Sequence, residues 1–146
     1  RTLIPAELRA LERMGVLTSK REKGSRVYRI DSTYPLAHDL HTFIISATTP
    51  SDKATAALFK PLAPYLVVAA GTLAAESRGA VDLLMVTKRT HDLRIAKAVK
   101  KLESFTAVPV RYLVLEVGEY RERREGFGRV LRDIIDFGHR VILGRA

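Results

Sequence analysis

The sequence contains no cysteine, which excludes disulfide frameworks, thiolate zinc sites and cysteine nucleophiles. It also lacks any apolar run near the roughly 20 residues that cross a bilayer. The longest such run, around residues 65–71, has the length of a strand. No segment has the pattern of a signal peptide. We therefore expect a soluble, cytoplasmic protein that does not bind membranes.

Positive charge is abundant and unevenly distributed. The 146 residues have a formal net charge of +9, with 47% hydrophobic and 28% charged residues, a balance typical of a globular protein with a packed core. Residues 1–30 hold eight cations and three anions, a net charge of +5. Because such an excess attracts polyanions, nucleic acid is the leading candidate partner.

The basic N-terminal region has a helix–hairpin–helix pattern. Pro5 and the spacing of Leu8 and Leu11 predict a short amphipathic helix over residues 5–15, ended by Gly15. Residues 16–30 predict a hairpin with a basic tip around EKGS, in which Gly24 allows a tight reversal. After Pro35, residues 36–47 predict a helix that links the two halves of the chain.

The stretch ELRALERMGVLTSKREKGSRVYRID resembles the recognition helix and wing of winged-helix transcriptional regulators of the arsenic-repressor type. The resemblance implies binding of double-stranded DNA, with the helix in the major groove and the hairpin on phosphates. A complete winged helix has further helices before the recognition helix, so we expect either that they lie upstream of Arg1 or that this half-module does not bind DNA alone. The implied DNA-binding residues are two on the helix and five on the wing: Arg9, Arg13, Lys20, Arg21, Lys23, Ser25 and Arg26.

The segment TYPLAHDL resembles the stretch after the wing in that family, where a helix often contributes to dimerisation. An apolar stripe follows the predicted linking helix, and a small module could not cover it alone. We therefore predict a homodimer whose interface contains Leu36, Leu40, Phe43 and Ile44.

Beyond residue 49, predicted strands alternate with predicted helices. Strands are expected in YLVVAAG, VDLLMVT, VRYLVLEV and RVILG, with helices before and between them. This order indicates an open α/β or α+β sheet covered by helices. For the whole chain we predict an α+β fold, with a partial winged helix over residues 1–48 and a second domain over residues 49–146. The expected core of its sheet contains Val67, Leu84, Val86 and Leu113.

From Lys53 onward, the order of elements resembles the minimal nucleotidyltransferase-like domain that is fused to such winged helices. That family has a Gly-Ser turn and, on the next strand, two acids separated by one residue, which hold Mg²⁺ for nucleotidyl transfer. Here the turn is Gly71-Thr72, Asp82 stands at the second acid and Ala80 replaces the first. Arg111 stands where a third acid would lie. The resemblance thus implies the remnant of an active site, without a metal or cofactor.

We interpret the chain as a DNA-binding transcriptional regulator whose nucleotidyltransferase-like domain is inactive and serves in dimerisation, effector binding or partner binding. One alternative is an active, antitoxin-like nucleotidyltransferase, with Asp82 and a second acid holding Mg²⁺ and a nucleotide as substrate. Glu76 is a candidate for the second acid, but we interpret it as a solvated loop residue. The other alternative is a structural module that contacts an acidic protein.

Overall fold

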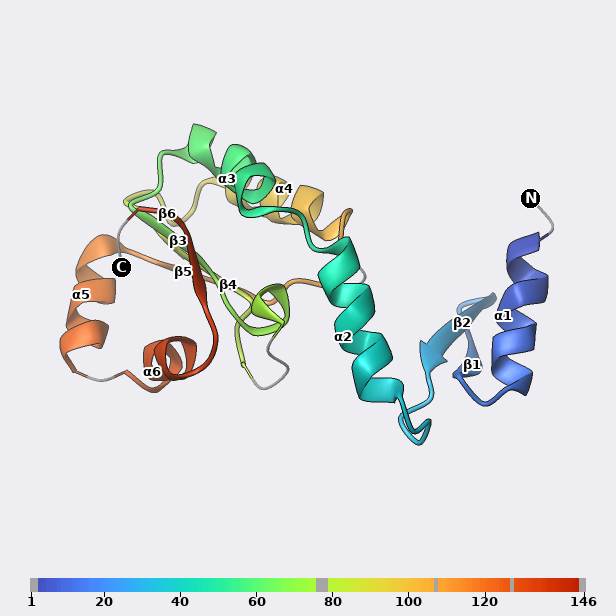
Figure 1. Ribbon diagram of the computed structural model, residues 1–146. Helices are drawn as coiled ribbons and strands as arrows, with labels where there is room; N and C mark the ends of the chain where they lie inside the picture. Colours follow the sequence, from blue (N-terminus) through green and yellow to red (C-terminus); the bar gives the residue numbers. More distant parts are fainter. Residues whose placement is uncertain (1–2, 76–78, 107, 127, 145–146) are drawn as a thin grey trace. The chain divides into compact units, whose positions relative to one another are not determined.

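The computed structural model describes residues 3–75, 79–106, 108–126 and 128–144 (Figure 1). The chain divides into two compact units, residues 1–44 (unit 1) and residues 45–146 (unit 2). This division falls inside helix α2 (Ala37–Thr48), whereas the sequence-based boundary, between residues 48 and 49, lies at the end of that helix. The predicted linking helix over residues 36–47 thus matches α2 within one residue at each end.

Unit 1 begins with α1 (Leu3–Arg13), followed by an antiparallel hairpin of β1 (Leu17–Glu22) and β2 (Ser25–Ile30). The helix ends where Gly15 adopts a positive φ of 75°. The next residue, Val16, donates its backbone N–H to the Leu11 carbonyl at 2.9 Å and is buried. The hairpin predicted over residues 16–30 is therefore present, directly after a glycine-terminated helix.

The hairpin reverses through two residues, Lys23 and Gly24, because Glu22 pairs directly with Ser25. Both turn residues have positive φ, 49° for Lys23 and 83° for Gly24. These values define a type I′ turn, whose twist matches that of the flanking strands. Gly24 has the predicted role, but Lys23 is unusual because non-glycine residues adopt this conformation at a cost.

Unit 2 contains a four-stranded mixed sheet in the order β5-β4-β3-β6. Strand β3 (Leu66–Ala69) is antiparallel to both β4 (Leu83–Val86) and β6 (Arg140–Leu143). Strand β4 is parallel to β5 (Tyr112–Leu115). The α+β fold class predicted from the sequence is thus confirmed.

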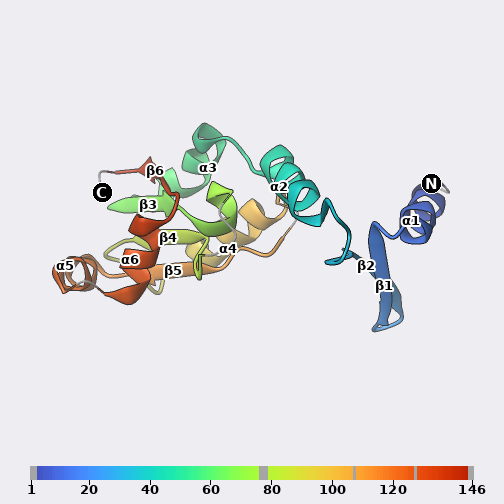
Figure 2. The same cartoon turned by 60° about the horizontal axis from the view of Figure 1, so that its bottom comes forward.

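Helices cover both faces of this sheet. Figures 1 and 2 show α3 (Asp52–Phe59) and α4 (Leu93–Glu103) on one face, and α5 (Val117–Glu125) and α6 (Arg129–Asp136) on the other. Successive strand residues point to opposite faces and enter two separate apolar clusters. Covering both faces explains why β3 and β4 are continuous apolar runs instead of alternating ones.

The predicted core residues of the sheet are confirmed. Val67, Leu84 and Val86 are buried, and Leu113 is partly buried against the cluster beneath α5 and α6. Within the described ranges, no helix combines the length and the apolarity that a membrane span requires.

Candidate functional site

The turn after β3 packs directly against the residue before β4. The Ala70 N–H donates to the Asp82 carbonyl at 2.8 Å, and a short 3₁₀ helix, η2 (Gly71–Ala74), follows. Gly71 has a φ of +46°, and a Cβ there would lie 2.6 Å from Asp82 Oδ1 and 2.7 Å from the Val81 carbonyl oxygen. This position therefore accepts only glycine, for both conformational and steric reasons.

The Asp82 side chain is buried, with 1% of its surface exposed, and both of its oxygens accept hydrogen bonds. Oδ1 accepts from the Thr72 backbone N–H and from Arg111 Nη2, both at 2.8 Å. Oδ2 accepts from the Arg111 backbone N–H and from Arg111 Nε, both at 2.9 Å. A carboxylate offers about four lone-pair sites, so the protein itself supplies a donor for each of them.

Strand pairing places Arg111 beside Asp82. The two residues immediately precede the parallel strands β5 and β4, and the Asp82 N–H donates to the Arg111 carbonyl at 2.7 Å. Burial alone raises the pKa of Asp82, but the hydrogen bonds from Arg111 and Thr72 outweigh it and hold this pKa below its usual value. At neutral pH the pair is therefore a bidentate ion pair between a carboxylate and a guanidinium.

Helix α6 covers the Gly71 turn and leaves little space beside it. The remaining hollow holds about 10 Å³, close to the volume occupied by a single water probe. A nucleotide does not fit there. The lining comes from the turn, from the segment before β4 and from α6 with the residues after it: Ala70, Gly71, Gly79, Ala80, Val81, Val130, Asp133, Ile134, Phe137 and Gly138.

The structure brings together the predicted remnant residues Gly71, Thr72 and Asp82, with Arg111 bound directly to the carboxylate. Glu76, considered as a replacement acid, lies outside the described residues. Among the residues that the structure describes, no three His, Asp or Glu side chains form a group able to hold a metal ion. This arrangement supports a structural ion pair in which the Arg111 guanidinium neutralises the Asp82 carboxylate.

No family model, curated protein or solved structure matches the chain. The chemistry of the Asp82 site and that of the basic residues of unit 1 therefore follow from their own side chains.

Cations from α1 and from the hairpin line one open hollow in unit 1, with a volume of about 610 Å³. Arg9 and Arg13 come from α1, one turn apart, and Arg26 comes from β2. The acid Glu12 lies between them in the same lining. Of the predicted DNA contacts, the two helix cations and the wing cation Arg26 therefore share one hollow, and Glu12 is an internal counter-charge whose role the sequence analysis missed.

Arg26 is held in place by its own unit. Its Nε donates to Ser19 Oγ at 2.9 Å, and Ser19 Oγ donates to Glu12 Oε1 at 2.6 Å. Its guanidinium also lies 3.9 Å from Glu12 and 5.8 Å from the centre of the Tyr28 ring. Half of the Arg26 side chain remains exposed, so it is oriented but accessible.

The other predicted wing contacts differ from Arg26, and from the hairpin cation Arg29, which pairs with Glu22 at 3.0 Å. Among the described residues, the side chains of Lys20, Arg21 and Lys23 form no hydrogen bond or ion pair, and all three are exposed. Arg21 lies directly opposite Arg26 in the hairpin, an unfavourable pairing of like charges that Glu12 offsets on the Arg26 side alone among the described residues. Ser25, the remaining predicted contact, is exposed opposite Glu22 beside the turn.

The predicted dimer stripe on and before α2 is partly exposed. Leu36 and Phe43 expose 55% and 69% of their surface, whereas Leu40 and Ile44 are half-buried. The stripe therefore exposes two large apolar side chains, Leu36 and Phe43.

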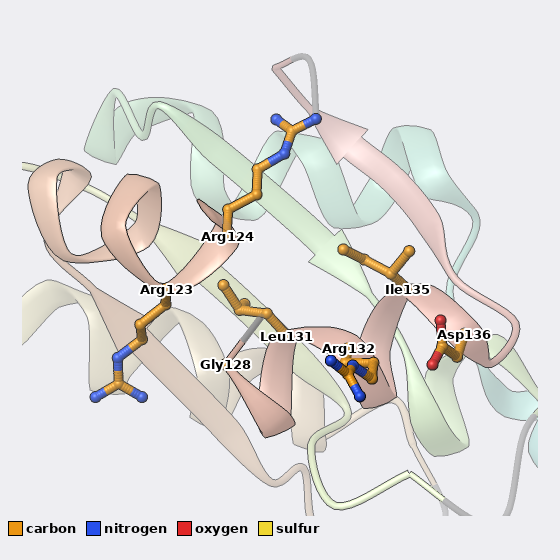
Figure 3. A pocket seen from close by; sticks show the side chains of 7 residues that line it. All are labelled: Arg123, Arg124, Gly128, Leu131, Arg132, Ile135 and Asp136. Carbon is orange, nitrogen blue, oxygen red and sulfur yellow. The ribbon is translucent and has the colours of Figure 1, made fainter. Parts of the chain in front are cut away.

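A second hollow, of about 490 Å³, lies between α5 and α6 (Figure 3). Leu131 and Ile135 supply apolar surface, and Arg123, Arg124 and Arg132 line its basic parts. The charge is partly neutralised, because Arg123 pairs with Glu119 at 2.7 Å and Asp136 also lines the hollow. The sequence analysis missed this hollow because it forms only when the two helices pack.

Proposed function

We propose that the protein is a DNA-binding transcriptional regulator. Unit 1 binds double-stranded DNA, and the nucleotidyltransferase-like domain in unit 2 is catalytically inactive. The observation that carries the proposal is the set of hairpin cations without internal partners next to the basic hollow on α1. Phosphates would relieve the repulsion between Arg21 and Arg26 and would bind the exposed Lys20 and Lys23.

The conformation of Lys23 supports the same proposal. A type I′ turn favours Asn or Asp at this position, and a lysine with positive φ costs of order 1 kcal/mol. Lys23 therefore costs some stability at the tip of the hairpin. A phosphate bound there by its ammonium group would offset this cost.

The absence of catalysis is proposed from the Asp82–Arg111 pair. Nucleotidyl transfer needs acids whose oxygens face Mg²⁺, but all four lone-pair directions of Asp82 receive donors of the chain. We expect no Mg²⁺-dependent incorporation of label from ATP, CTP, GTP or UTP into protein or small acceptors. Robust incorporation would overturn this part of the proposal.

The DNA-binding experiment is a titration of a fluorescent duplex at several salt concentrations. The Arg21→Ala/Arg26→Ala variant should bind more weakly than the wild type, and its log–log salt slope should be smaller by about two, because each lost phosphate contact removes about one released counterion. The matched control, Lys97→Ala/Lys101→Ala on the exposed side of α4, removes the same charge and should keep the wild-type slope. Equal slopes for the wild type and the hairpin variant would contradict the proposal.

We further propose that the regulator is a homodimer that uses the α2 stripe. Phe43 is its most exposed member, and burying it against a second copy would remove a large apolar side chain from water. Multi-angle light scattering at micromolar concentration should give a dimer for the wild type and a monomer for Phe43→Asp. A monomeric wild type at that concentration would contradict the proposed dimer.

A further inference from the structure

A separate hollow of about 640 Å³ opens in unit 2 at the end of the sheet where β4 and β5 finish. Asp82 and Arg111 precede these two strands, whereas Thr87 and Val117 follow them and line the hollow. At about 3.3 Å per residue, the five steps from Asp82 to Thr87 span roughly 16 Å. The hollow is therefore distinct from the ion pair at the opposite end of the sheet.

One wall of this hollow is strongly basic. Its lining includes Lys88, Arg89, Arg94 and Arg121 and contains no acidic residue. Arg94 is already bound by Asp92, with guanidinium–carboxylate contacts between 2.6 and 3.1 Å. Among the described residues, the other three cations form no ion pair, although Arg89 also interacts electrostatically with Asp92. The charge of Lys88 and Arg121 is therefore the most available to a ligand.

The loop that presents these cations is fixed by hydrogen bonds. Thr87 is buried, its N–H donates to the Leu115 carbonyl at 3.0 Å, and its Oγ1 accepts from the Arg89 N–H at 3.2 Å. The Arg89 carbonyl in turn accepts from the Asp92 N–H at 3.2 Å. A ligand would therefore meet a preorganised loop, which lowers the entropic cost of binding.

Another part of the lining is mostly apolar. It consists of residues 61–65, which include two prolines and end at Tyr65, a residue 47% exposed. The Tyr65 N–H donates to the Val86 carbonyl at 2.8 Å, which fixes its backbone beside the end of β4. Gly144 approaches the Tyr65 carbonyl so closely that a Cβ there would lie 2.2 Å from its oxygen. An exposed aromatic residue on a fixed backbone thus lines the same hollow as the cations.

We propose that this hollow binds a small organic phosphate that carries a flat ring. Its volume lies within the range of small-molecule sites, about 300–1,000 Å³. Lys88, Arg89 and Arg121 would bind a doubly charged phosphate, and the Tyr65 ring would stack on the ligand's ring. Unit 2 thereby becomes a ligand-binding unit, independent of whether unit 1 binds DNA.

A small ligand fits this surface better than a long polyanion. Asp92 lies on the loop that ends the basic wall, and Glu116 and Glu119 begin α5, on which Arg121 lies. These acids limit the extent of positive surface around the hollow. A strand of nucleic acid that continued beyond it would meet them, whereas one phosphate group would not.

The test is calorimetric titration of the full chain with AMP as the probe, and with adenosine and inorganic phosphate as its two halves. We expect saturable 1:1 binding of AMP, at least tenfold tighter than either half. Lys88→Ala/Arg121→Ala should weaken AMP binding at least tenfold. Tyr65→Leu should weaken AMP binding about fivefold or more without changing phosphate binding.

Matched variants separate this proposal from DNA binding by unit 1. Lys97→Ala/Lys101→Ala removes equal charge elsewhere in unit 2, and Arg21→Ala/Arg26→Ala removes it from the hairpin; both should retain wild-type AMP affinity. The proposal is overturned by an absence of saturable AMP binding or by an equal loss in either control. A single-stranded 20-mer oligonucleotide provides a further test. If it displaces AMP from the wild type and binds Lys88→Ala/Arg121→Ala more weakly, the hollow is part of a nucleic-acid surface and the proposal is overturned.

Discussion

In unit 2 the buried carboxylate of Asp82 receives four hydrogen bonds from its own chain, whereas in unit 1 the cations Lys20, Arg21 and Lys23 have no acidic partner among the described residues. The first arrangement joins a turn to two strands and needs nothing from outside. The second leaves exposed positive charge that a bound anion would neutralise. We therefore assign a structural role to the internally partnered charge of Asp82 and propose ligand binding for the unpartnered cations of the hairpin.

The largest effect is expected from removing the internally partnered charge. Asp82→Ala should lower the free energy of unfolding of unit 2 by about 3 kcal/mol, because the amides of Thr72 and Arg111 lose their acceptor and a cavity forms. Unfolding in urea, monitored by hydrogen exchange of the β3 and β4 amides, measures this loss. The exposed Asp136→Ala is the control and should change stability by less than about 0.5 kcal/mol. A similar result for both variants would show that the ion pair is not structural.

The Asp82–Arg111 pair should make the stability of unit 2 depend on pH. The pKa of Asp82 is lowered in the folded state, so its contribution is complete above the unfolded pKa of about 3.9 and is lost as the pH falls through the lower folded pKa. The stability difference between the wild type and Asp82→Asn should be constant above about pH 5 and decrease below pH 4. Thermal unfolding between pH 2 and pH 7 measures it. The lowered pKa values of Asp31 and Asp92, the latter about 2, cancel in the subtraction.

A smaller loss is expected when the geometry of the pair changes but its charge remains. Arg111→Lys keeps a cation beside Asp82 but loses the two-pronged contact made by Nε and Nη2. We expect a loss of about 1–2 kcal/mol in the same urea experiment. A loss as large as that of Asp82→Ala would indicate that the fork, and not the charge, is decisive.

The smallest effect is expected in unit 1, where Glu12 partly neutralises the hollow lined by Arg9, Arg13 and Arg26. Glu12→Gln should raise duplex DNA affinity about two- to threefold at low salt, and this gain should fade as salt screens the charge. The exposed Glu125→Gln in unit 2 removes the same charge and serves as the control. Unchanged affinity for Glu12→Gln would exclude the α1 hollow from the DNA interface.

The features that the sequence predicted well are local ones. The hairpin follows from alternating residues around a Gly24 turn, and the buried strands follow from short apolar runs such as those containing Val67 and Leu84. The position of Asp82 beside Gly71 was expected from the nucleotidyltransferase-like pattern. The residues that form the hairpin and each strand lie close together in the chain. The order of the Gly71 turn and Asp82 was given by the family resemblance.

The features that the sequence could not supply depend on distant segments. The resemblance placed Arg111 near Asp82, but the ion pair between them depends on the parallel pairing of β4 and β5 after an intervening helix. The hollow at Tyr65 combines residues from the segment before β3, the loop after β4 and the start of α5. Glu12 was counted among the anions, but its contact with Arg26 requires the hairpin to pack on α1. Packing, which composition and periodicity do not encode directly, determines all three.

The position of β3 in the sheet has a consequence for the order of folding. Its neighbour β6 begins only at Arg140, so β3, whose four residues are fully buried, has one unpaired edge until the last strand has been synthesised. At about 5–20 residues per second, that edge stays open for several seconds on the ribosome. The hairpin of unit 1 is local and closes within roughly 10 microseconds of emerging. During synthesis the residues of the basic hairpin can therefore pair well before the sheet is complete, and until β6 is made the apolar β3 presents an open edge of the kind that promotes aggregation.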